Sequence, residues 1–452
     1  MSDIGNKDYP ENYLKLREEI HQHLEKSNPR EAFILIRSFL SYPNKITNDL
    51  LFKDALELLE KIIRFLIGEN LAEIVLDLIE NPESISVLYD LAYDLYELNI
   101  HDIAAFLLDR ANTIKPQDSK IVSELVGNLE ALMLNKDAYD ILSQSKELVD
   151  SDELHRYLLA FNGLMIGKIE EPLKLLPTLQ NSADSDIQFM YKALKGMLNR
   201  SSVLKKSRSL DDKDLRGWHM ILNGSILLHR SPYGLEDGMY GRYAYISDSF
   251  PLIQEGINRL KNVLDISGLK IPSILALPDR SSQILAIAAS KLLNISLKQW
   301  NEIDVNTQGL IVAYDLDGIY SEDILIEIAE HRPNQILWAH ASCWTNAFPF
   351  SPDITTYLYQ ENANPWSGGG LAYNMKEKKV TITESDMSKE EEIALRVLEA
   401  SKDADYIDDL DDLLSMMEPL KNLENEALPG IFKEKGRRIR QRQGSPVRSN
   451  RF

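Results

Sequence analysis

The sequence has few of the residues that form cross-links, membrane spans or phosphate-binding loops. Its 452 residues include one cysteine, Cys343, so no disulfide can form within the chain. No apolar run approaches the roughly 20 residues that cross a bilayer as a helix. A Walker loop, a Gly-x-Ser-x-Gly elbow and a complete Gly-x-Gly-x-x-Gly motif are all absent. The familiar signatures of nucleotide binding and of serine hydrolases are therefore missing.

Positive charge is also in short supply. The chain has 50 Lys and Arg against 70 Asp and Glu, a net charge of −20, so most of it should repel nucleic acid and anionic membranes. The first residues, MSDIGNKDYPENY, have no apolar core of a secretory signal. The eight histidines show no metal-ligand spacing with one another, and no second pair completes a site with His340 and Cys343. We expect a cytoplasmic protein with no membrane partner and no metal.

The exception is the C-terminal tail. From Lys433 to Phe452 there are eight Lys or Arg residues and one acid, Glu434. These arginines could pair with RNA phosphates or with an acidic protein face, and they could equally neutralise the acidic stretch just upstream. A short tail on an acidic body favours intramolecular or protein contact over nucleic acid. The candidate partner-binding residues of the tail are Arg437, Arg438, Arg440 and Arg442.

The tail and the stretch before it have different expected structures. Residues 402–428 are acidic and carry Leu and Met at helical spacing, which predicts an amphipathic helix that docks on a partner or on the body. Residues 429–452 are too polar to fold alone, so we expect a disordered basic tail.

Residues 10–206 have the roughly 3.6-residue apolar period of helices almost throughout. Pro29 opens a second helix, and Pro43 and Pro82 close successive helix pairs. The anchors of the clearest pair are Leu88, Leu91, Ala92, Leu95, Ala104, Leu108, Ala111 and Pro116. A shift of about 34 residues places Val122, Leu125, Val126, Leu129, Ala138 and Leu142 on the same positions. This pattern resembles the tetratricopeptide repeat, which implies an α-solenoid of helix pairs.

A solenoid of this kind has a concave face that commonly holds partner peptides or docks another domain. The resemblance therefore implies protein–protein interaction. The alternative is that the solenoid only supports the second half of its own chain. Tyr89, Tyr93 and Tyr96 lie on the first helix of the clearest repeat and are the candidate partner-binding residues. Aromatic residues at helical spacing also occur in cores, and that interpretation stays open.

Residues 214–401 alternate between short apolar runs and helix-period runs, the order of a parallel-sheet α/β domain. The predicted strands are 273–277, 310–314, 335–340, 354–359 and 379–383, and the predicted helices are 251–264, 283–293, 322–331 and 390–401. Before them, residues 218–228 and 240–246 are predicted as short strands or a lid, and residues 201–213 as a linker. Ligands of such sheets bind beyond the carboxyl ends of the strands.

Two segments resemble a known enzyme family. ILALPDRSSQILAIAASKLLNI and GLIVAYDLDGIYSEDILIEI are similar to the pyrophosphate loop and the ribose-phosphate loop of type I phosphoribosyltransferases. The resemblance covers residues 272–366, about a fifth of the chain. It implies a five-stranded parallel core that binds phosphoribosyl pyrophosphate with Mg²⁺ and transfers the ribose to a base or an amine.

The candidate ligand-binding residues lie in these two loops. In the first loop, Asp279, Arg280, Ser281 and Ser282 replace the glycines of the family. Arg280 could clamp an anion and the serines could donate to it, although capping of the following helix explains the same residues. Asp315 and Asp317 follow the second strand and suit a cation or a sugar hydroxyl, or simply a turn.

The phosphate-binding turn of the second loop is altered. Bulky and acidic side chains occupy residues 319–323, where a phosphate would need bare backbone N–H groups. We therefore expect an interaction or scaffold protein whose phosphoribosyltransferase-like domain has lost its reaction and could sense a small ligand. The alternatives are a working phosphoribosyl- or nucleotide-processing transferase that uses Mg²⁺, and an RNA-associated adaptor that acts through the tail.

Overall fold

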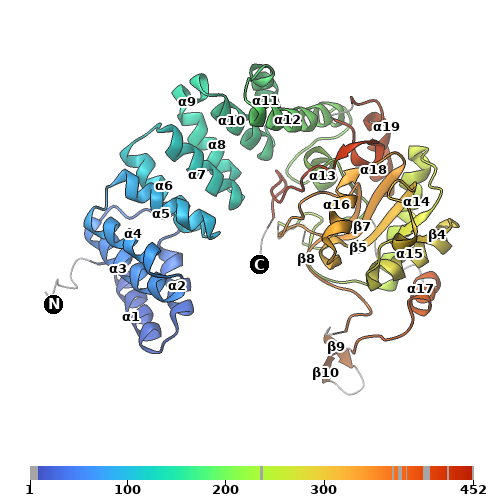
Figure 1. Cartoon of the computed structure of the whole chain (residues 1–452), viewed down its shortest axis with the longest axis horizontal. Coiled ribbons are helices and arrows are strands. Elements are labelled where there is room, and N and C mark those ends of the chain that lie inside the picture. The colour runs from blue at the N-terminus through green and yellow to red at the C-terminus, as the bar shows by residue number, and fades with distance from the viewer. Residues whose placement is uncertain are drawn as a thin grey trace. The chain divides into compact units, whose positions relative to one another are not determined.

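The chain divides into a helical unit and a unit built on a parallel sheet (Figure 1). The computed structural model describes residues 9–234, 238–368, 371–374, 379–382, 384–400, 408–424 and 427–449. The first unit holds residues 1–166 and 177–187, and the second holds residues 167–176 and 188–452. Among the described helices, none combines the length and the apolar character that a membrane span requires.

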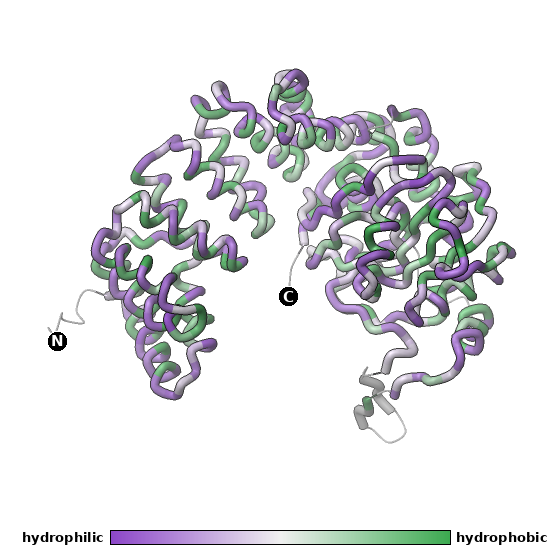
Figure 2. Tube along the Cα trace, viewed as in Figure 1, coloured by the Kyte–Doolittle hydropathy of each residue, from purple (hydrophilic) through white to green (hydrophobic). Residues whose placement is uncertain are grey.

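The first unit is a run of paired helices. They are α1 (Glu11–Glu25), α2 (Pro29–Phe39), α3 (Asp49–Leu66), α4 (Glu69–Glu80), α5 (Ile85–Glu97), α6 (His101–Ile114), α7 (Ser119–Ala131), α8 (Asn135–Gln144), α9 (Lys146–Ser151) and α10 (Glu153–Met165). From α1 to α8, every helix packs against the next one in sequence. Figure 2 shows apolar and polar stretches alternating along these helices, the pattern of helices that bury one side.

Local sequence explains where these helices begin and how closely they pack. Pro29 lies in the first turn of α2, where its missing N–H loses no helical hydrogen bond. Ala92 of α5 and Ala104 and Ala111 of α6 are fully buried, because short side chains allow helices to approach closely. The predicted run of helix pairs is confirmed.

The second unit is built on a seven-stranded sheet in which all pairings are parallel. Its strands are β1 (Ile226–Leu227), β2 (Tyr243–Ser247), β3 (Ile274–Ala276), β4 (Leu297–Gln299), β5 (Gly309–Asp315), β7 (Gln335–Cys343) and β8 (Ile354–Ala363). Their order is β1-β8-β7-β5-β3-β4, and β2 pairs with the C-terminal half of β8. The predicted parallel α/β sheet is confirmed, with more strands than the five that the resemblance implied.

The second unit also contains helices and two small antiparallel strand pairs. Its helices are α11 (Glu170–Leu175), α12 (Ser185–Leu204, which begins in the first unit), α13 (Leu215–Asn223), α14 (Phe250–Ser267), α15 (Arg280–Leu293), α16 (Glu322–Ile328), α17 (Glu390–Glu399), α18 (Leu410–Ser415) and α19 (Met417–Leu420). Short turns of 3₁₀ helix are Leu176–Leu179, Trp300–Glu302, Leu316–Gly318 and Gly430–Phe432. Two small antiparallel pairs join β9 (Leu371–Asn374) to β10 (Lys379–Ile382) and β6 (Glu330–His331) to β11 (Gly436–Arg437).

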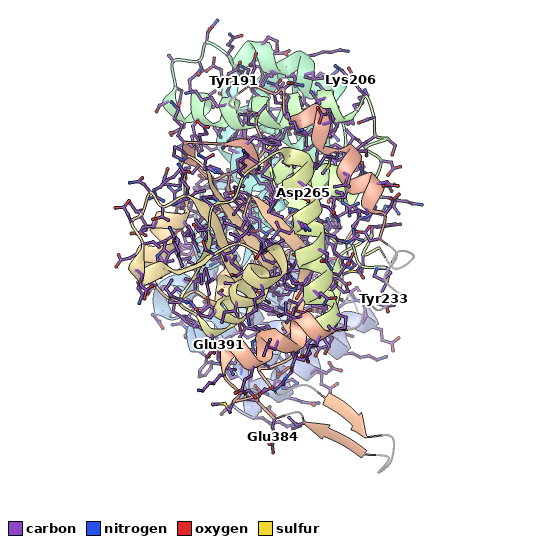
Figure 3. All side chains as sticks on the ribbon, turned by 90° about the vertical axis from the view of Figure 1, so that its right-hand side faces the viewer. Tyr191, Lys206, Tyr233, Asp265, Glu384 and Glu391 are labelled. Atoms are coloured by element: carbon purple, nitrogen blue, oxygen red, sulfur yellow. The ribbon has the colours of Figure 1, made fainter. Side chains whose placement is uncertain are left out.

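Helices cover both faces of the sheet. Ile311 of β5 and Leu337 of β7 pack on one face together with Ile328 of α16. On the other face, α14 approaches so closely that a Cβ at Gly256 would lie 2.9 Å from Thr356 Cγ2. Helix α17 then packs against α14 and α15 (Figure 3). Alternate residues of each strand therefore point into separate apolar layers.

One stretch was predicted with the wrong element. Residues 218–228 were expected to be strand or lid, but residues 215–223 form α13, and only residues 226–227 pair as a strand. Every residue of α13 is buried. Its polar side chains Arg216, His219 and Asn223 are buried together with its apolar ones. The aromatic and aliphatic residues of this stretch favour a strand when the sequence alone is considered.

The C-terminal tail is ordered from residue 427 to residue 449, which contradicts the prediction of disorder. The N–H of Ser351 donates to the carbonyl of Ile439 at 2.7 Å, and the N–H of Arg438 donates to Ala329 at 2.8 Å. The Arg438 guanidinium, with the residue only 3% exposed, donates to Asp353 at 2.8 Å. A polar tail can thus fold when the body supplies matching polar partners, which composition alone does not reveal.

The acidic stretch before the tail is held in place by an arginine cluster, which we define as Arg208, Arg216, Arg230 and Arg259. Within the predicted helix 402–428, the described residues form two short helices, α18 and α19, while residues 402–407 and 425–426 lie outside the described chain. We call residues 408–424 the acidic strap. Its Leu413 and Met417 side chains are fully buried.

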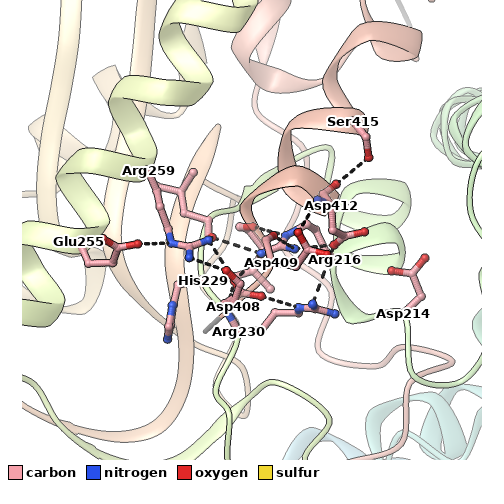
Figure 4. Close-up of polar contacts among 12 residues, drawn as sticks. Asp214, Arg216, His229, Arg230, Glu255, Arg259, Asp408, Asp409, Asp412 and Ser415 are labelled. Atoms are coloured by element: carbon pink, nitrogen blue, oxygen red, sulfur yellow. Dashed lines mark hydrogen bonds and ion pairs between the residues drawn. The ribbon is translucent and has the colours of Figure 1, made fainter. Parts of the chain in front are cut away.

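Two carboxylates of the strap bind this cluster (Figure 4). Asp408, whose side chain is 4% exposed, accepts from Arg216 at 2.6 Å and from Arg230 at 3.1 Å. Its backbone carbonyl accepts from Arg259 at 2.7 Å. Asp412 accepts from Arg216 at 2.5 Å. Burial alone would raise the pKa of Asp408, but the nearby guanidinium charges hold that pKa below its ordinary value.

Asp408→Asn is expected to lower the free energy of unfolding of the second unit by about 3–5 kcal/mol, because buried guanidinium groups lose their carboxylate. All five tryptophans lie in the second unit, so tryptophan fluorescence in urea follows this unit alone. Since the folded pKa of Asp408 is depressed, its contribution is present at neutral pH and is lost as the pH falls below about 4.

The matched control is Asp411→Asn, which changes an exposed carboxylate in the first turn of α18, three residues after Asp408, and should alter stability by less than about 0.5 kcal/mol. Equal losses for Asp408→Asn and Asp411→Asn would contradict a structural role for the cluster.

Candidate functional site

The candidate ligand site lies beyond the carboxyl ends of β3 and β5. The chain runs from β3 to β4 at the sheet edge and returns to β5 on the other side of β3. The direction of winding changes there, and open α/β sheets bind ligands at such a point. Asp279 follows β3 and Asp315 ends β5. The candidate residues predicted from the sequence therefore come from the two loops that meet at this point.

Asp279 and Ser282 build the start of α15. Asp279 is the N-cap, and its Oδ1 accepts from the Ser282 N–H at 2.9 Å. Ser282 is fully buried, and its hydroxyl oxygen accepts from the Tyr314 N–H at 2.9 Å. The second carboxylate oxygen of Asp279 is buried without a hydrogen-bond partner among the described residues. Burial raises the pKa of Asp279, although its bonds to Ser282 oppose that effect.

Arg280 and Ser281 are engaged by other parts of the second unit. The Arg280 guanidinium donates to the carbonyls of Asp386 and Ser388, each at 2.8 Å, and lies 3.3 Å from Glu390. The Ser281 hydroxyl accepts from the Trp366 indole at 2.9 Å. Arg280 therefore ties the segment before α17 to the start of α15.

Asp315 and Asp317 form the second half of the candidate site. Asp315 accepts from the Tyr359 hydroxyl and, at 3.2 Å, from the Asp317 N–H. Burial, aided by the charges of Asp317 and Asp279, raises the pKa of Asp315 to about 7, although the bond from Tyr359 opposes the shift. Burial also raises the pKa of Asp317. The carboxylates of Asp279, Asp315 and Asp317 disfavour the binding of a phosphate at this end of the sheet and favour the binding of hydroxyl or amine groups.

The turn that would cradle a phosphate is filled by its own side chains. Ile319 packs into the apolar core, and Tyr320 is exposed. Ser321 caps α16, and Glu322 and Asp323 occupy its first turn. Two carboxylates at that end of the helix already complement its dipole. The same groups would repel an incoming phosphate.

Metal chemistry is not evident at this point. Within the described part of the chain, no group of three His, Cys, Asp or Glu residues is arranged to hold a metal ion. The carboxylates of Asp279, Asp315 and Asp317 therefore do not fit a magnesium site built by the protein alone.

Sequence reasoning missed a buried polar group just below the candidate site. Asp248, which follows β2, accepts from the Tyr314 hydroxyl at 2.6 Å and from His340 Nε2 at 3.2 Å. His340 is fully buried between the rings of Tyr314 and Tyr357. No sequence spacing signals this contact, because Asp248 and His340 lie 92 residues apart. This buried contact joins the segment after β2 to β5 and β7.

The three candidate tyrosines of the first unit have different environments. The Tyr89 hydroxyl donates to Glu124 of α7 at 3.4 Å, and the ring is partly buried. Tyr93 and Tyr96 are 47% and 36% exposed, and the Tyr96 ring lies 5.0 Å from the His101 ring. Tyr93 and Tyr96 are therefore available at the surface of the unit, while Tyr89 mainly links α5 to α7.

The candidate arginines of the tail also differ. Arg438 is bound to Asp353, as described above. Arg437 lies in β11, which pairs with β6, and its side chain is exposed, as is that of Arg440. The Arg442 N–H donates to the Asn223 side chain at 2.7 Å. The tail arginines are thus spread over an ordered segment and do not form one free basic strip.

Comparison with known proteins adds no family to this description. No protein-family model matches the chain, and no curated protein matches its sequence. The helical array and the parallel α/β sheet therefore define the architecture without assigning a family.

Carbon-13 NMR of labelled aspartate side chains is expected to show Asp315 titrating with a midpoint near 7, because burial disfavours its ionised form. Since this pKa is raised on folding, the protonated form contributes stability that is fully present below about pH 4 and is lost as the pH rises toward 7. Asp317→Asn should lower the midpoint by removing a like charge. A midpoint near 4 in the unchanged protein would disprove the buried environment.

Proposed function

We propose that the chain is an interaction protein that binds a protein partner through its helical array, and that its α/β unit has no transferase activity. The main support for partner binding is that large apolar and aromatic side chains are exposed on the array, at the end of α3 and along α5. Phe65 is 77% exposed, and Tyr93 and Leu98 are 47% and 45% exposed. Ile67 at the end of α3 and Leu98 at the end of α5 line one pocket, and contiguous exposed apolar surface marks sites where a partner binds.

The state of the candidate ligand site supports the second half of this proposal. A transferase of the type that the sequence resembles needs free anion-binding groups at the loops after β3 and β5. Here Arg280 is bound to two carbonyls, Ser281 to Trp366 and Ser282 to Tyr314. The carboxylates at the same point add negative charge. The Arg280 guanidinium is thus already engaged, and the carboxylates would repel a phosphate even though both serine hydroxyls accept in these bonds and keep an O–H to donate.

A second candidate function is the binding of a small uncharged or cationic ligand at the same point. The specific observation is the Asp279 oxygen that is buried without a partner, next to an Asp315 carboxyl whose pKa is raised to about 7. A ligand hydroxyl or amine would supply the missing donor. This role is compatible with a partner-binding array. The RNA-adaptor alternative has less support, because the tail arginines lie in an ordered segment.

The double variant Tyr93→Ala/Tyr96→Ala is expected to release the proteins that the intact chain retains in quantitative affinity capture, because truncation of exposed aromatic anchors weakens interfaces most. The matched control is Tyr245→Ala, which truncates a tyrosine that is 58% exposed on the second unit. Retention of the same proteins by the double variant and by the control would refute binding through this face of the array.

Calorimetry with phosphoribosyl pyrophosphate and Mg²⁺ is expected to show no binding to the intact chain, because the site offers carboxylates where phosphates need donors. Magnesium-dependent binding that Asp315→Asn abolishes would overturn the claim of lost transferase chemistry and would favour an active enzyme.

A further inference from the structure

One pocket on the helical array has apolar walls and an apolar floor. It lies at the turn between α3 and α4 and at the end of α5, has a volume of about 470 Å³ and opens to solvent. Ile67 and Leu98 line it with 40% and 45% of their surfaces exposed, and the buried Leu71 forms its floor. Exposed aliphatic walls around a solvent-filled space gain free energy when another apolar side chain replaces the water.

The rim of this pocket is acidic. Glu69, Asp94 and Glu97 all line it. Arg64 pairs with Glu69, so that charge is partly neutralised. Asp94 and Glu97 make no ion pair with any described residue. An apolar pocket with a net negative rim favours an occupant that brings positive charge beside an apolar group.

The negative charge of the rim extends along α5. Asp90, Asp94 and Glu97 follow one another at helical spacings of four and three residues, so their side chains share one side of the helix. Like charges at this spacing repel each other, and a cation placed between them would relieve the repulsion. Tyr93 lies next to this row with 47% of its surface exposed, and its ring face can accept a cation.

We propose that the pocket and the acidic side of α5 bind a peptide segment of a partner protein in which Lys or Arg residues flank a leucine-like side chain. The apolar side chain enters between Ile67 and Leu98, and the flanking cations pair with Asp94 and Glu97. This inference rests on the proposed function of the array and specifies its partner class. A second copy of this chain fits less well, because a molecule with net charge −20 is repelled by an acidic rim.

The probe is the fluorescein-labelled peptide Gly-Ser-Lys-Lys-Leu-Leu-Lys-Lys-Gly-Ser, with fluorescence anisotropy as the readout on the full chain. Two comparison peptides carry Ser in place of Leu or Glu in place of Lys. The test variants are Asp94→Lys/Glu97→Lys and Leu98→Ser, which change exposed or half-buried side chains. The matched control is Glu18→Lys/Glu19→Lys, which makes the same charge change at two exposed residues of α1. Circular dichroism confirms that all variants keep their helices.

The expected result is binding of the Lys-Leu peptide that falls by about tenfold or more in each test variant and that the Glu18→Lys/Glu19→Lys control leaves unchanged. Raising the salt to about 0.3 M should weaken this binding, and both comparison peptides should bind more weakly. Equal weakening by the control variant would mean general attraction to an acidic protein and would overturn the proposal. Equal binding of the Ser peptide would also overturn it.

Two further outcomes separate this inference from the proposed function. If no Lys-Leu peptide binds while affinity capture still depends on Tyr93 and Tyr96, the partner class is wrong and partner binding by the array stands. If the intact chain forms a dimer in sedimentation experiments and Leu98→Ser makes it monomeric, a second copy occupies the pocket and the proposal fails.

Discussion

The second unit depends on the pairing of buried guanidinium groups with carboxylates that come from distant parts of the chain. Arg208, Arg216, Arg230 and Arg259 face four carboxylates, those of Asp214, Glu255, Asp408 and Asp412. Two of those carboxylates belong to the acidic strap, so removing the strap would leave the buried Arg216 and the partly exposed Arg230 without a carboxylate. An unpaired buried charge is far more costly than an exposed one. The strap is therefore part of the folded unit and closes it against solvent.

The same principle applies to the polar side chains at the start of α15, beyond the carboxyl ends of β3 and β5. Serine and arginine side chains at the start of α15 bind Trp366, Tyr314 and the segment before α17. Each of these bonds satisfies a polar group that would otherwise be buried alone. These side chains therefore join β5, α15 and the segment before α17. The carboxylates of Asp279, Asp315 and Asp317 lie at the same point, and burial raises the pKa of each.

Much of this architecture could be predicted from the sequence, because the spacing of apolar residues within each helix or strand depends only on residues that are close in sequence. Pro29 marks the start of α2, and the alternation of apolar runs along residues 273–340 marks the strands and helices of the parallel sheet. Asp279 and Asp315 could be selected for the same reason, since each directly follows or ends an apolar strand.

The features that were missed depend on residues that are distant in sequence. Arg216 and Asp408 are separated by 192 residues, and Asp248 and His340 by 92. No spacing rule connects such pairs. The order of the tail was missed for the same reason: Arg438 looks like a free charge in the sequence, and only Asp353, 85 residues away, makes it a buried one. Residues 215–223 were missed because their aromatic and aliphatic side chains favour a strand in the sequence, whereas the structure buries them in a helix.

Hydrogen exchange followed by mass spectrometry tests most directly whether the strap belongs to the folded unit. At neutral pH the amides of α18 and α19 should be as strongly protected as those of α13 and α14, because they can open only when the buried charge pairs separate. Rapid exchange of residues 410–420 while α13 and α14 remain protected would contradict this account.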